Sequence, residues 1–562
     1  ALIPLPLGPA SNALTLNYLP TYKADRVTHI PAVKIDQNIG SKDKISFYWS
    51  KTNTSSAISP GLGQADGLPD PITTAIGTYV PAIVMRLNYD RTLTPTMLLH
   101  LGAGYQYVDQ GVPSVNTDGS IRNYDVEKEL GLKGGIINRF FPTFTGLTFA
   151  GTGSGMKNFG SQSDTHNYTE KPTYTASLTD VRGNHTIKYG AELRTEGYPA
   201  KNWGTAGGSY GFSYAQTAQP YWNGQLVSGT SSGFPYASFL LGQVNNGVIG
   251  NPVTPRLGKK QFGIFVQDTW KVTRKLTLDY GLRYDYSTYL QEQYNRIPWF
   301  SESIVNPTVG RAGGVIFDRQ DGTGALSHNY PLAFGPRLGV SYQIDSKTVF
   351  RAGFGVVYNG TSPNNNAGGG LANSTNNFTT STFGDPVTTL AVGIPTSFRP
   401  VPWPNTNPGL FPITRTAAPS AMPAPRLDQN AGRPPRQYQW SIGIQREVSR
   451  DLVIEASYVA NRGVWWNAPA LLNLNALTPA MLQSYGLDIS NAADRTLLTS
   501  TLGSAAAQAR GFNTRLPYSG FPTGQTVAQS LRPFPQFTTI QTYWDPLGKT
   551  WYDSLQAKVS KR

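Results

Sequence analysis

Six charged residues occupy alternating positions in segments that have the pattern of β-strands. They are Glu192, Arg194, Asp279, Arg283, Asp285 and Arg351. Because side chains alternate between the two faces of a strand, charges at every second position point to the same side. Guanidinium and carboxylate groups at this spacing could bind a polar solute through charge-assisted hydrogen bonds. They could also form a solvated lattice on the wall of a wide pore, which is the simpler interpretation.

The chain carries no residue pattern typical of catalysis. Its five histidines lack metal-ligand spacing, and no His-Glu-x-x-His motif, no Gly-x-Ser-x-Gly motif and no cysteine occurs. Gly151–Gly155 lacks the lysine of a phosphate-binding loop, and segment 318–324 lacks the further acids of a calcium loop. His100, between Leu99 and Leu101, is expected on the polar face in a structural role. We therefore predict no enzyme activity, no bound metal and no cofactor.

Tryptophans recur in the long polar segments between the strands. The set comprises Trp203, Trp222, Trp299, Trp403, Trp465 and Trp466. Such rings could stack on sugars or hold a peptide, which would make them a ligand-binding surface. They could equally pack the loops together or lie at a lipid–water boundary, and the sequence leaves these alternatives open.

The segment 276–286 shows most clearly what kind of element positions the charges. One face holds only leucines and tyrosines, and the other holds Thr277, Asp279, Gly281, Arg283 and Asp285. A strand of about eleven residues is long for a soluble sheet but crosses a bilayer when tilted. Repeated tyrosines on the apolar face are typical of an outer-membrane barrel, whose aromatic rings lie at the membrane boundary. The pattern predicts lipid on one side and water on the other.

The same alternation recurs in six hairpins with turn-forming residues at their tips. They are 33–49, 82–107, 174–194, 261–286, 337–358 and 439–458, and 551–560 has the pattern of a thirteenth strand without a partner. Between them lie long segments rich in Gly, Pro, Asn, Ser and Thr, at about 53–80, 109–167, 199–259, 288–333, 359–437 and 462–549. Short periplasmic turns and long extracellular loops are typical of outer-membrane barrels. We predict an all-β fold, a large antiparallel transmembrane β-barrel.

Composition agrees with this fold class. The 562 residues are 39% hydrophobic and only 14% charged, with no apolar run long enough for a helical membrane span. The net charge is +14, but lysine and arginine are dispersed and form no basic block. This distribution argues against a nucleic-acid partner and fits a general attraction to anionic lipopolysaccharide or anionic ligands.

The segment Phe262–Asp285 resembles the mid-barrel hairpin of TonB-dependent outer-membrane receptors. Segments 33–49, 439–458 and Ala237–Gly242 resemble the Oar-like branch, whose members carry a carboxypeptidase-regulatory-like domain ahead of the plug. The resemblance implies a barrel of about 22 strands, filled by an N-terminal plug, with import driven by an inner-membrane TonB complex. This chain would supply roughly 12 to 14 of those strands or more. No ligand residue is carried over, because substrate contacts in this superfamily lie in variable loops and the plug.

Departures from the family pattern suggest the domain organisation. We expect residues 1–30 to be a lead-in from a plug that is missing here, and 31–562 to be a partial barrel without closing C-terminal strands. No plug, TonB box or regulatory-like domain is recognisable before Val33. Lys561 and Arg562 do not form the aromatic-ended closing strand that such barrels use.

The function expected from these observations is TonB-dependent uptake of a bulky solute, such as a siderophore, glycan or peptide, across the outer membrane of a Gram-negative-type bacterium. Expected partners are outer-membrane lipid, lipopolysaccharide, the solute and, through a plug, the TonB complex. One alternative is a structural or adhesive surface barrel, because the loops hold more residues than the strands. Another is a soluble carbohydrate-binding propeller, which would have shorter and more evenly spaced strands.

Overall fold

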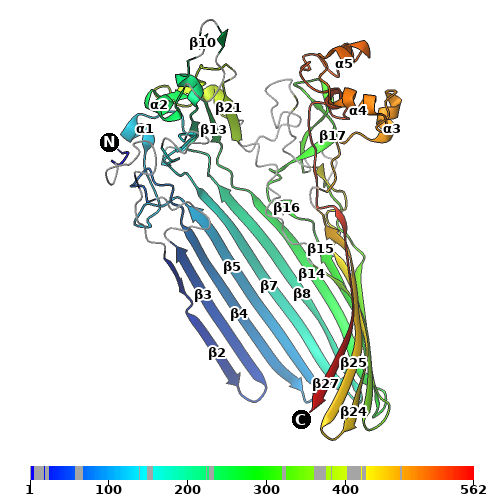
Figure 1. Cartoon of the computed structure of the whole chain (residues 1–562). Helices are drawn as coiled ribbons and strands as arrows, with labels where there is room; N and C mark the ends of the chain where they lie inside the picture. The colour runs from blue at the N-terminus through cyan, green and yellow to red at the C-terminus, as the bar shows by residue number, and fades with distance from the viewer. Residues whose placement is uncertain are drawn as a thin grey trace.

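One large antiparallel sheet dominates the computed structural model (Figure 1). The structure describes residues 2–5, 18, 25–56, 67–137, 139–148, 156–219, 221–222, 225–226, 233–318, 325–359, 375–380, 382–400, 419, 426–468 and 471–561. The sheet has fifteen strands, of which β1 (Arg26–His29) and β16 (Gln291–Glu292) are short segments paired with β3 and β14. The long strands follow one another in chain order.

Their bounds are β2 (Ala32–Ile39), β3 (Asp43–Ser56), β4 (Thr78–Thr94), β5 (Met97–Pro113), β7 (Asp164–Arg182), β8 (His185–Asn202), β14 (Arg256–Lys271), β15 (Leu276–Ser287), β19 (Ala333–Gln343), β20 (Thr348–Tyr358), β24 (Arg436–Ser449), β25 (Leu452–Asn467) and β27 (Pro546–Lys561). The six predicted hairpins are confirmed. The unpartnered segment 551–560 is also a strand, and it pairs with β25 along almost its whole length. The all-β, outer-membrane-type sheet is therefore as the alternation predicted, but the sheet is open, since β2 and β27 are not paired with each other in the described part of the chain.

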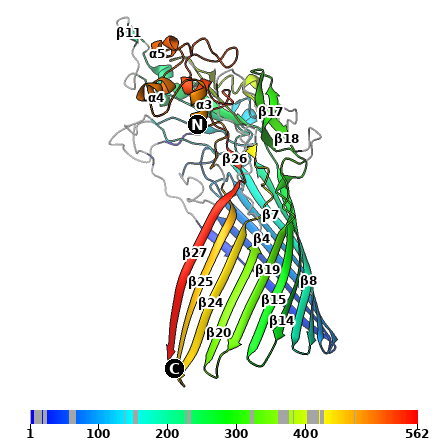
Figure 2. The same cartoon turned by 90° about the vertical axis from the view of Figure 1, so that its right-hand side faces the viewer.

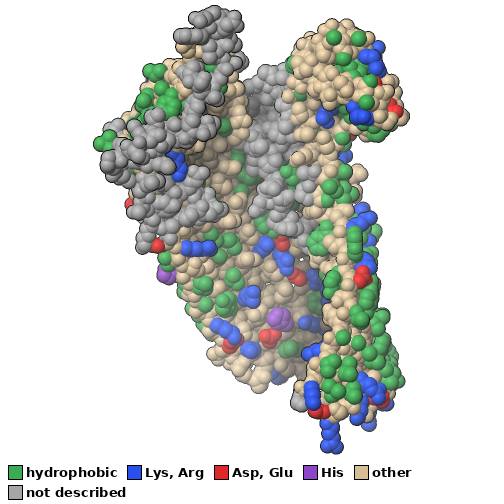
Figure 3. Space-filling view, viewed as in Figure 1, with side chains coloured by type: hydrophobic (Ala, Val, Ile, Leu, Met, Phe, Trp, Pro, Cys, Tyr) green, Lys and Arg blue, Asp and Glu red, His purple; other side chains and the backbone are tan. Residues whose placement is uncertain are grey.

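The register separates the two faces of the sheet. Val266 lies opposite Leu282, and Leu282 lies opposite Pro336, so apolar side chains continue across β14, β15 and β19 on one face. Val266 is 51% exposed and Leu282 is 44% exposed, as expected for side chains whose natural solvent is lipid. We call this the outer face. Lysine, arginine, aspartate, glutamate and histidine side chains are distributed over the opposite, hollowed inner face (Figure 3).

The two ends of the sheet differ in their connections. At one end the strands are joined by short turns, where Gly40 and Gly183 adopt positive φ angles of 63° and 58° that favour glycine. Several strands are longer than the roughly 9–11 residues that cross a bilayer; β7, for example, has 19 residues. At their far ends, away from the short turns, the strands carry two folded lobes (Figures 1 and 2).

The first lobe is built from the connections that follow β5, β8 and β20. It contains α1 (Val126–Leu130), α2 (Pro235–Leu240), η1 (Tyr214–Thr217), η3 (Thr396–Phe398) and a small sheet in the order β21 (Thr375–Thr379), β13 (Asn246–Gly250), β9 (Ser209–Gly211) and β6 (Thr143–Thr145). The pairs β12 (Gln243–Val244) with β22 (Thr388–Thr389), and β10 (Tyr221–Trp222) with β11 (Gln225–Leu226), complete it. Its aromatic core centres on Phe144, which stacks on Phe159 with ring centroids 4.6 Å apart.

The second lobe stands above the β19–β27 side of the sheet (Figure 1). It contains the hairpin β17 (Pro298–Asn306) and β18 (Arg311–Phe317), and the helices α3 (Pro479–Ser484), α4 (Ala492–Thr499), α5 (Ala505–Ala509) and α6 (Val527–Ser530). The parallel pair β23 (Arg426–Leu427) and β26 (Thr542–Tyr543) lies at its base. No helix in the described ranges is long and apolar enough to span a membrane.

Candidate functional site

Strands β8, β14 and β15 bring charged side chains together on the inner face. Gly263 of β14 lies opposite both Glu192 of β8 and Asp285 of β15, so the two carboxylates flank a residue without a side chain. A Cβ atom at Gly263 would lie 2.3 Å from Nη2 of Arg283. The glycine therefore leaves the space that the Arg283 guanidinium occupies between its partners.

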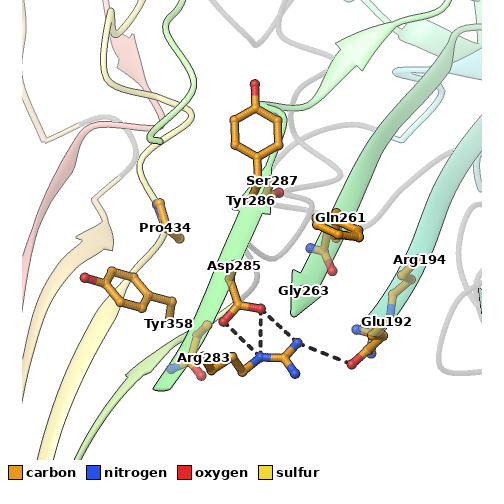
Figure 4. Close-up of a pocket in the computed structure, with 12 residues that line it drawn as sticks. Glu192, Arg194, Gln261, Gly263, Arg283, Asp285, Tyr286, Ser287, Tyr358 and Pro434 are labelled. Atoms are coloured by element: carbon orange, nitrogen blue, oxygen red, sulfur yellow. Dashed lines mark hydrogen bonds and ion pairs between the residues drawn. The ribbon is translucent and has the colours of Figure 1, made fainter. Parts of the chain in front are cut away.

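Arg283 connects the two carboxylates (Figure 4). Its Nε donates to Oδ1 and Oδ2 of Asp285 at 2.8 and 3.0 Å, and its Nη2 donates to Oε2 of Glu192 at 3.3 Å. Arg194 Nη2 donates to the other Glu192 oxygen at 2.8 Å. Glu192, Arg194, Arg283 and Asp285 thus form one network, whereas the sequence indicated only that they share a face.

The network continues upward into a more buried pair. Glu196 of β8 lies opposite Lys259 of β14, and their charged atoms are 3.4 Å apart. The Lys259 side chain is only 2% exposed. Tyr198 donates a short hydrogen bond to the same Glu196 carboxylate. We call Glu192, Arg194, Glu196, Lys259, Arg283 and Asp285 the inner cluster.

Sequence reasoning missed Glu196 and Lys259. The signal was present, because Glu192, Arg194 and Glu196 alternate on one strand and share a face. What the sequence does not reveal is that Lys259 lies opposite Glu196, since the two strands are separated by a long loop and their register depends on the folded sheet.

The inner cluster borders a pocket of about 200 Å³ that opens on the inner face. Tyr286, Tyr358 and Pro434 also line it, and the two tyrosine rings point away from the Arg283 network (Figure 4). The cluster pairs three cations with three anions, and its formal net charge is zero. It can therefore offer hydrogen-bond donors and acceptors to a polar solute or protein surface, but it has no excess charge with which to select an ion.

A wider hollow of about 520 Å³ lies beside the cluster on the same face. Its wall includes Arg86, Lys171 and Arg194, three cations from β4, β7 and β8. Gly102 and Gly104 lie in its floor, where the lack of side chains deepens it. This part of the inner face is more basic than the inner cluster.

The other two charged candidates lie apart from the cluster. Asp279 is nearer the short turns, where it accepts a hydrogen bond from Thr269 Oγ1 at 2.6 Å. Arg351 is on β20 and donates to Gln445 Oε1 at 3.2 Å. Both share the inner face with the cluster, because Asp279 pairs in register with Gly339 and Arg351 with Ser341 of the same strand. They are consistent with a polar lining distributed over many strands.

The described loop tryptophans lie in separate places, in the second lobe, at the upper end of β25 and at the upper rim. Trp299 is 5% exposed and packs edge-on against Trp544, with ring centroids 5.4 Å apart, in the second lobe. Trp465 lies beneath two guanidinium groups, with the Arg436 carbon 4.0 Å from the ring centroid. The next residue in the chain, Trp466, is half-buried. Trp403 and the side chain of Trp222 lie outside the described residues.

Trp203 belongs to a charged group at the upper rim beneath the first lobe. Lys201 Nζ lies 4.2 Å from the Trp203 ring centroid and 2.6 Å from Asp164 Oδ2. Arg139 Nη2 lies 2.6 Å from Asp164 Oδ2, and His166 Nε2 lies 3.4 Å from Asp164 Oδ1. The hydrogen bond to Asp164 raises the pKa of His166. Burial acts to raise the pKa of Asp164, but its bonded cations outweigh burial and hold that pKa below its usual range.

The described residues contain no group of three or more His, Asp or Glu side chains placed to hold a metal ion. Asp318, the first residue of the rejected calcium-loop pattern, instead accepts bonds from Tyr289 Oη and the Leu326 amide; residues 319–324 lie outside the described ranges. The inner cluster is suited to binding and lining.

Comparison with known proteins identifies the class of this sheet. A family model described as "Outer membrane beta barrel domain" matches residues 1–562. No curated protein matches the chain.

Similar solved structures include the outer membrane transporter YddB from Escherichia coli, at 13% sequence identity and a TM-score of 0.44, covering 79% of this chain and 41% of YddB. The ferric yersiniabactin uptake receptor FyuA from Yersinia pestis is 8% identical with a TM-score of 0.37, covering 79% of this chain and 46% of FyuA. The FrpB iron transporter from Neisseria meningitidis is 12% identical with a TM-score of 0.35, covering 79% and 46%. The chain therefore spans less than half the length of these three structures.

Proposed function

The chain belongs to the outer membrane beta-barrel domain family, and from that premise we propose that it is the barrel portion of a receptor that takes up a bulky polar solute. The family places it in the outer membrane of a Gram-negative cell. The observation that carries the proposal is the contrast between the two faces of the sheet. The outer face is apolar, whereas the inner face presents the inner cluster and two hollows to water.

The proposal includes the energy source and the partners. We propose that a plug occupies the inner face, that an inner-membrane TonB complex acts through that plug, and that the protein belongs to the Oar-like branch. The inner cluster has equal numbers of cations and anions, which supports contact with a polar protein surface. Its paired charges offer many hydrogen bonds, and covering them does not bury an unpaired ion, which would carry a large desolvation cost. Candidate solutes are a siderophore, a glycan or a peptide, and lipopolysaccharide surrounds the outer face.

The edges of the sheet support further strands in the closed barrel. Every residue of β2 is exposed, and β27 is exposed along most of its length. In the hydrocarbon region each unpaired backbone group costs several kcal/mol, so both edges must be covered. Because the chain has no cysteine, the double variant Val33→Cys and Leu555→Cys tests whether the edges meet. We expect no disulfide between them in the membrane, and efficient cross-linking would contradict the additional strands.

Uptake is tested on the receptor in its native outer membrane. Mass spectrometry of material co-purified with the protein should identify a solute, and cells should accumulate that solute only while TonB is intact. The variant Glu192→Gln should change the affinity for the solute or the plug without removing the protein from the membrane. Accumulation that is equal with and without TonB would exclude the proposed energy source.

A structural or adhesive role is the second candidate, and the folded second lobe favours it. Its helices α3–α6 enclose their own apolar core, as expected of an independent surface module. Asn475 and Phe534 are joined by two hydrogen bonds of 2.9 and 2.8 Å, so a short Gly-Ser linker can replace residues 476–532. Adhesion predicts loss of surface attachment with uptake intact, whereas a receptor role predicts the reverse.

A further inference from the structure

The upper ends of β24, β25 and β27 carry basic side chains on the outer face of the sheet. Phe354 of that face lies opposite Trp440, and Arg436 lies four residues further up the same strand as Trp440. Because side chains alternate along a strand, Arg436 shares the face of Trp440. Arg436 lies opposite Val464, and Val464 lies opposite Lys549. The register therefore places both cations on the side of the sheet that faces lipid.

The length of β24 places Arg436 at one boundary of the membrane. Between Arg436 and Arg446 the outer face of this strand holds only aromatic and aliphatic side chains, which are Tyr438, Trp440, Ile442 and Ile444. The ten-residue step from Arg436 to Arg446 covers roughly 33 Å along the strand, or about 25 Å across the membrane at a tilt of about 40°. The apolar band of an outer-membrane barrel has this height. Arg446 thus marks the boundary near the short turns, and Arg436 marks the extracellular boundary.

Aromatic rings hold the upper arginines in place. The guanidinium carbons of Arg436 and Arg433 lie 4.0 and 4.6 Å from the centroid of the Trp465 ring. Arg433 also lies 5.6 Å from the Tyr330 ring, and Arg436 lies 5.0 Å from the Tyr438 ring. Trp465 has a φ angle of 65° beside an irregularity in the pairing of β25 with β27. A bulky residue rarely adopts this conformation, and such backbone strain is concentrated at functional positions.

We call Arg433, Arg436, Trp465 and Lys549 the outer basic patch. Among the residues that the structure describes, no carboxylate forms an ion pair with any of its three cations. The acid of the neighbouring outer-face row, Asp553, is already bound by Arg462 at 2.8 Å. The outer basic patch therefore has an excess of positive charge, in contrast to the inner cluster, whose charges balance.

We propose that the outer basic patch binds the phosphate groups of lipopolysaccharide in the outer leaflet. Guanidinium groups bind phosphate oxygens in a planar, bidentate fashion, and the exposed Lys549 adds a further ammonium group. Aromatic residues suit this depth because one end of the ring contacts acyl chains and the other contacts polar groups. Trp551, which is 72% exposed, extends the aromatic surface on β27.

This site gives a location to the general attraction between a basic chain and lipopolysaccharide. It assigns Trp465 to the lipid–water boundary, one of the alternatives that the sequence left open for the tryptophans. The inference rests on the placement of the sheet in the outer membrane and is independent of the proposed uptake, since the outer basic patch is on the opposite face from the inner cluster.

Binding is tested on the purified full-length protein in detergent. The protein is held on an affinity resin with increasing concentrations of lipopolysaccharide, and the retained acyl chains are measured by mass spectrometry. The unmodified protein should retain lipopolysaccharide saturably. The double variant Arg433→Gln and Arg436→Gln should bind about thirtyfold more weakly, because each arginine near an anionic lipid surface contributes about fivefold.

Arg446→Gln is the matched control. Arg446 is on the same strand and the same face, but it lies at the opposite boundary, 3.7 Å from Asp345. This variant should bind lipopolysaccharide like the unmodified protein. Both variants should keep the circular-dichroism spectrum and the unfolding temperature of the unmodified protein, so that weaker binding does not reflect a loss of the fold.

Two further ligands identify the group that is bound. Lipopolysaccharide stripped of its phosphates should bind the unmodified protein as weakly as intact lipopolysaccharide binds the double variant. Inorganic phosphate at millimolar concentration should not displace intact lipopolysaccharide. Equal binding by the double variant and the unmodified protein, or undiminished binding of the stripped lipid, would overturn the proposal, and displacement by inorganic phosphate would replace the lipid with a free anion.

Discussion

Replacement of Phe144 by alanine should open the first lobe while leaving the transmembrane sheet intact. Phe144 is 5% exposed and lies at the centre of an aromatic group. Its ring contacts those of Phe159 at 4.6 Å, Tyr210 at 5.5 Å and Phe239 at 5.9 Å between centroids. Phe→Ala at such a site costs about 3–5 kcal/mol from lost burial and the remaining cavity. At tenfold for each ~1.4 kcal/mol, local opening becomes about a hundredfold to a few thousandfold more frequent.

Hydrogen–deuterium exchange read by mass spectrometry measures this opening. Amides of β9 and β13, which pair with each other in the small sheet, should exchange faster by that factor, whereas amides of β14 and β15 should not change. Phe354→Ala is the matched control, because Phe354 is a 43% exposed residue of the outer face. Unchanged protection of β9 and β13 in Phe144→Ala would refute the view that this aromatic core holds the lobe together.

Three further predictions concern the inner cluster, the rim and the small sheet. Arg283→Gln leaves the two carboxylates that it bridges without this cation, so reversal potentials in planar bilayers should shift toward cation selectivity; an unchanged potential would place the cluster outside the ion path. The pKa of His166 is raised in the folded protein. Protonated His166 therefore contributes fully to the stability of the fold below a pH of about 6.5, and this contribution is lost as the pH rises through the folded pKa. Limited proteolysis of the first lobe should therefore speed up with increasing pH in the unmodified protein but not in His166→Gln. In Gly247→Val a Cβ would lie 2.3 Å from the Ser209 carbonyl oxygen. The first lobe should therefore lose about 1–3 kcal/mol of stability to overpacking. A thermal stability equal to that of the unmodified protein would show that β9 and β13 can move apart without cost.

Strand alternation was sufficient to predict the transmembrane sheet, because its rule is local. Every second residue of 276–286 faces lipid whatever its neighbours are, so the hairpins could be recognised one at a time. The lobes could not be found in this way. Trp299 packs against Trp544, and Phe144 stacks near Tyr210, through contacts between segments that no periodicity links. The pairing of Glu196 with Lys259 was hidden for the same reason, since register across a long loop is determined by the whole sheet.

The balance of charges in the inner cluster bears on where solute selectivity should arise. A charged solute that binds Arg283 must compete with Asp285 and Glu192, both already within 3.3 Å of its nitrogens, so each new contact replaces an existing one and the net gain is small. The upper rim of the sheet is different, because the ring of Trp203 lies there against a cationic side chain. We therefore expect substitutions beside Trp203 at the upper rim to change which solute is bound, and substitutions in the inner cluster to change how readily any polar solute or plug moves along the wall.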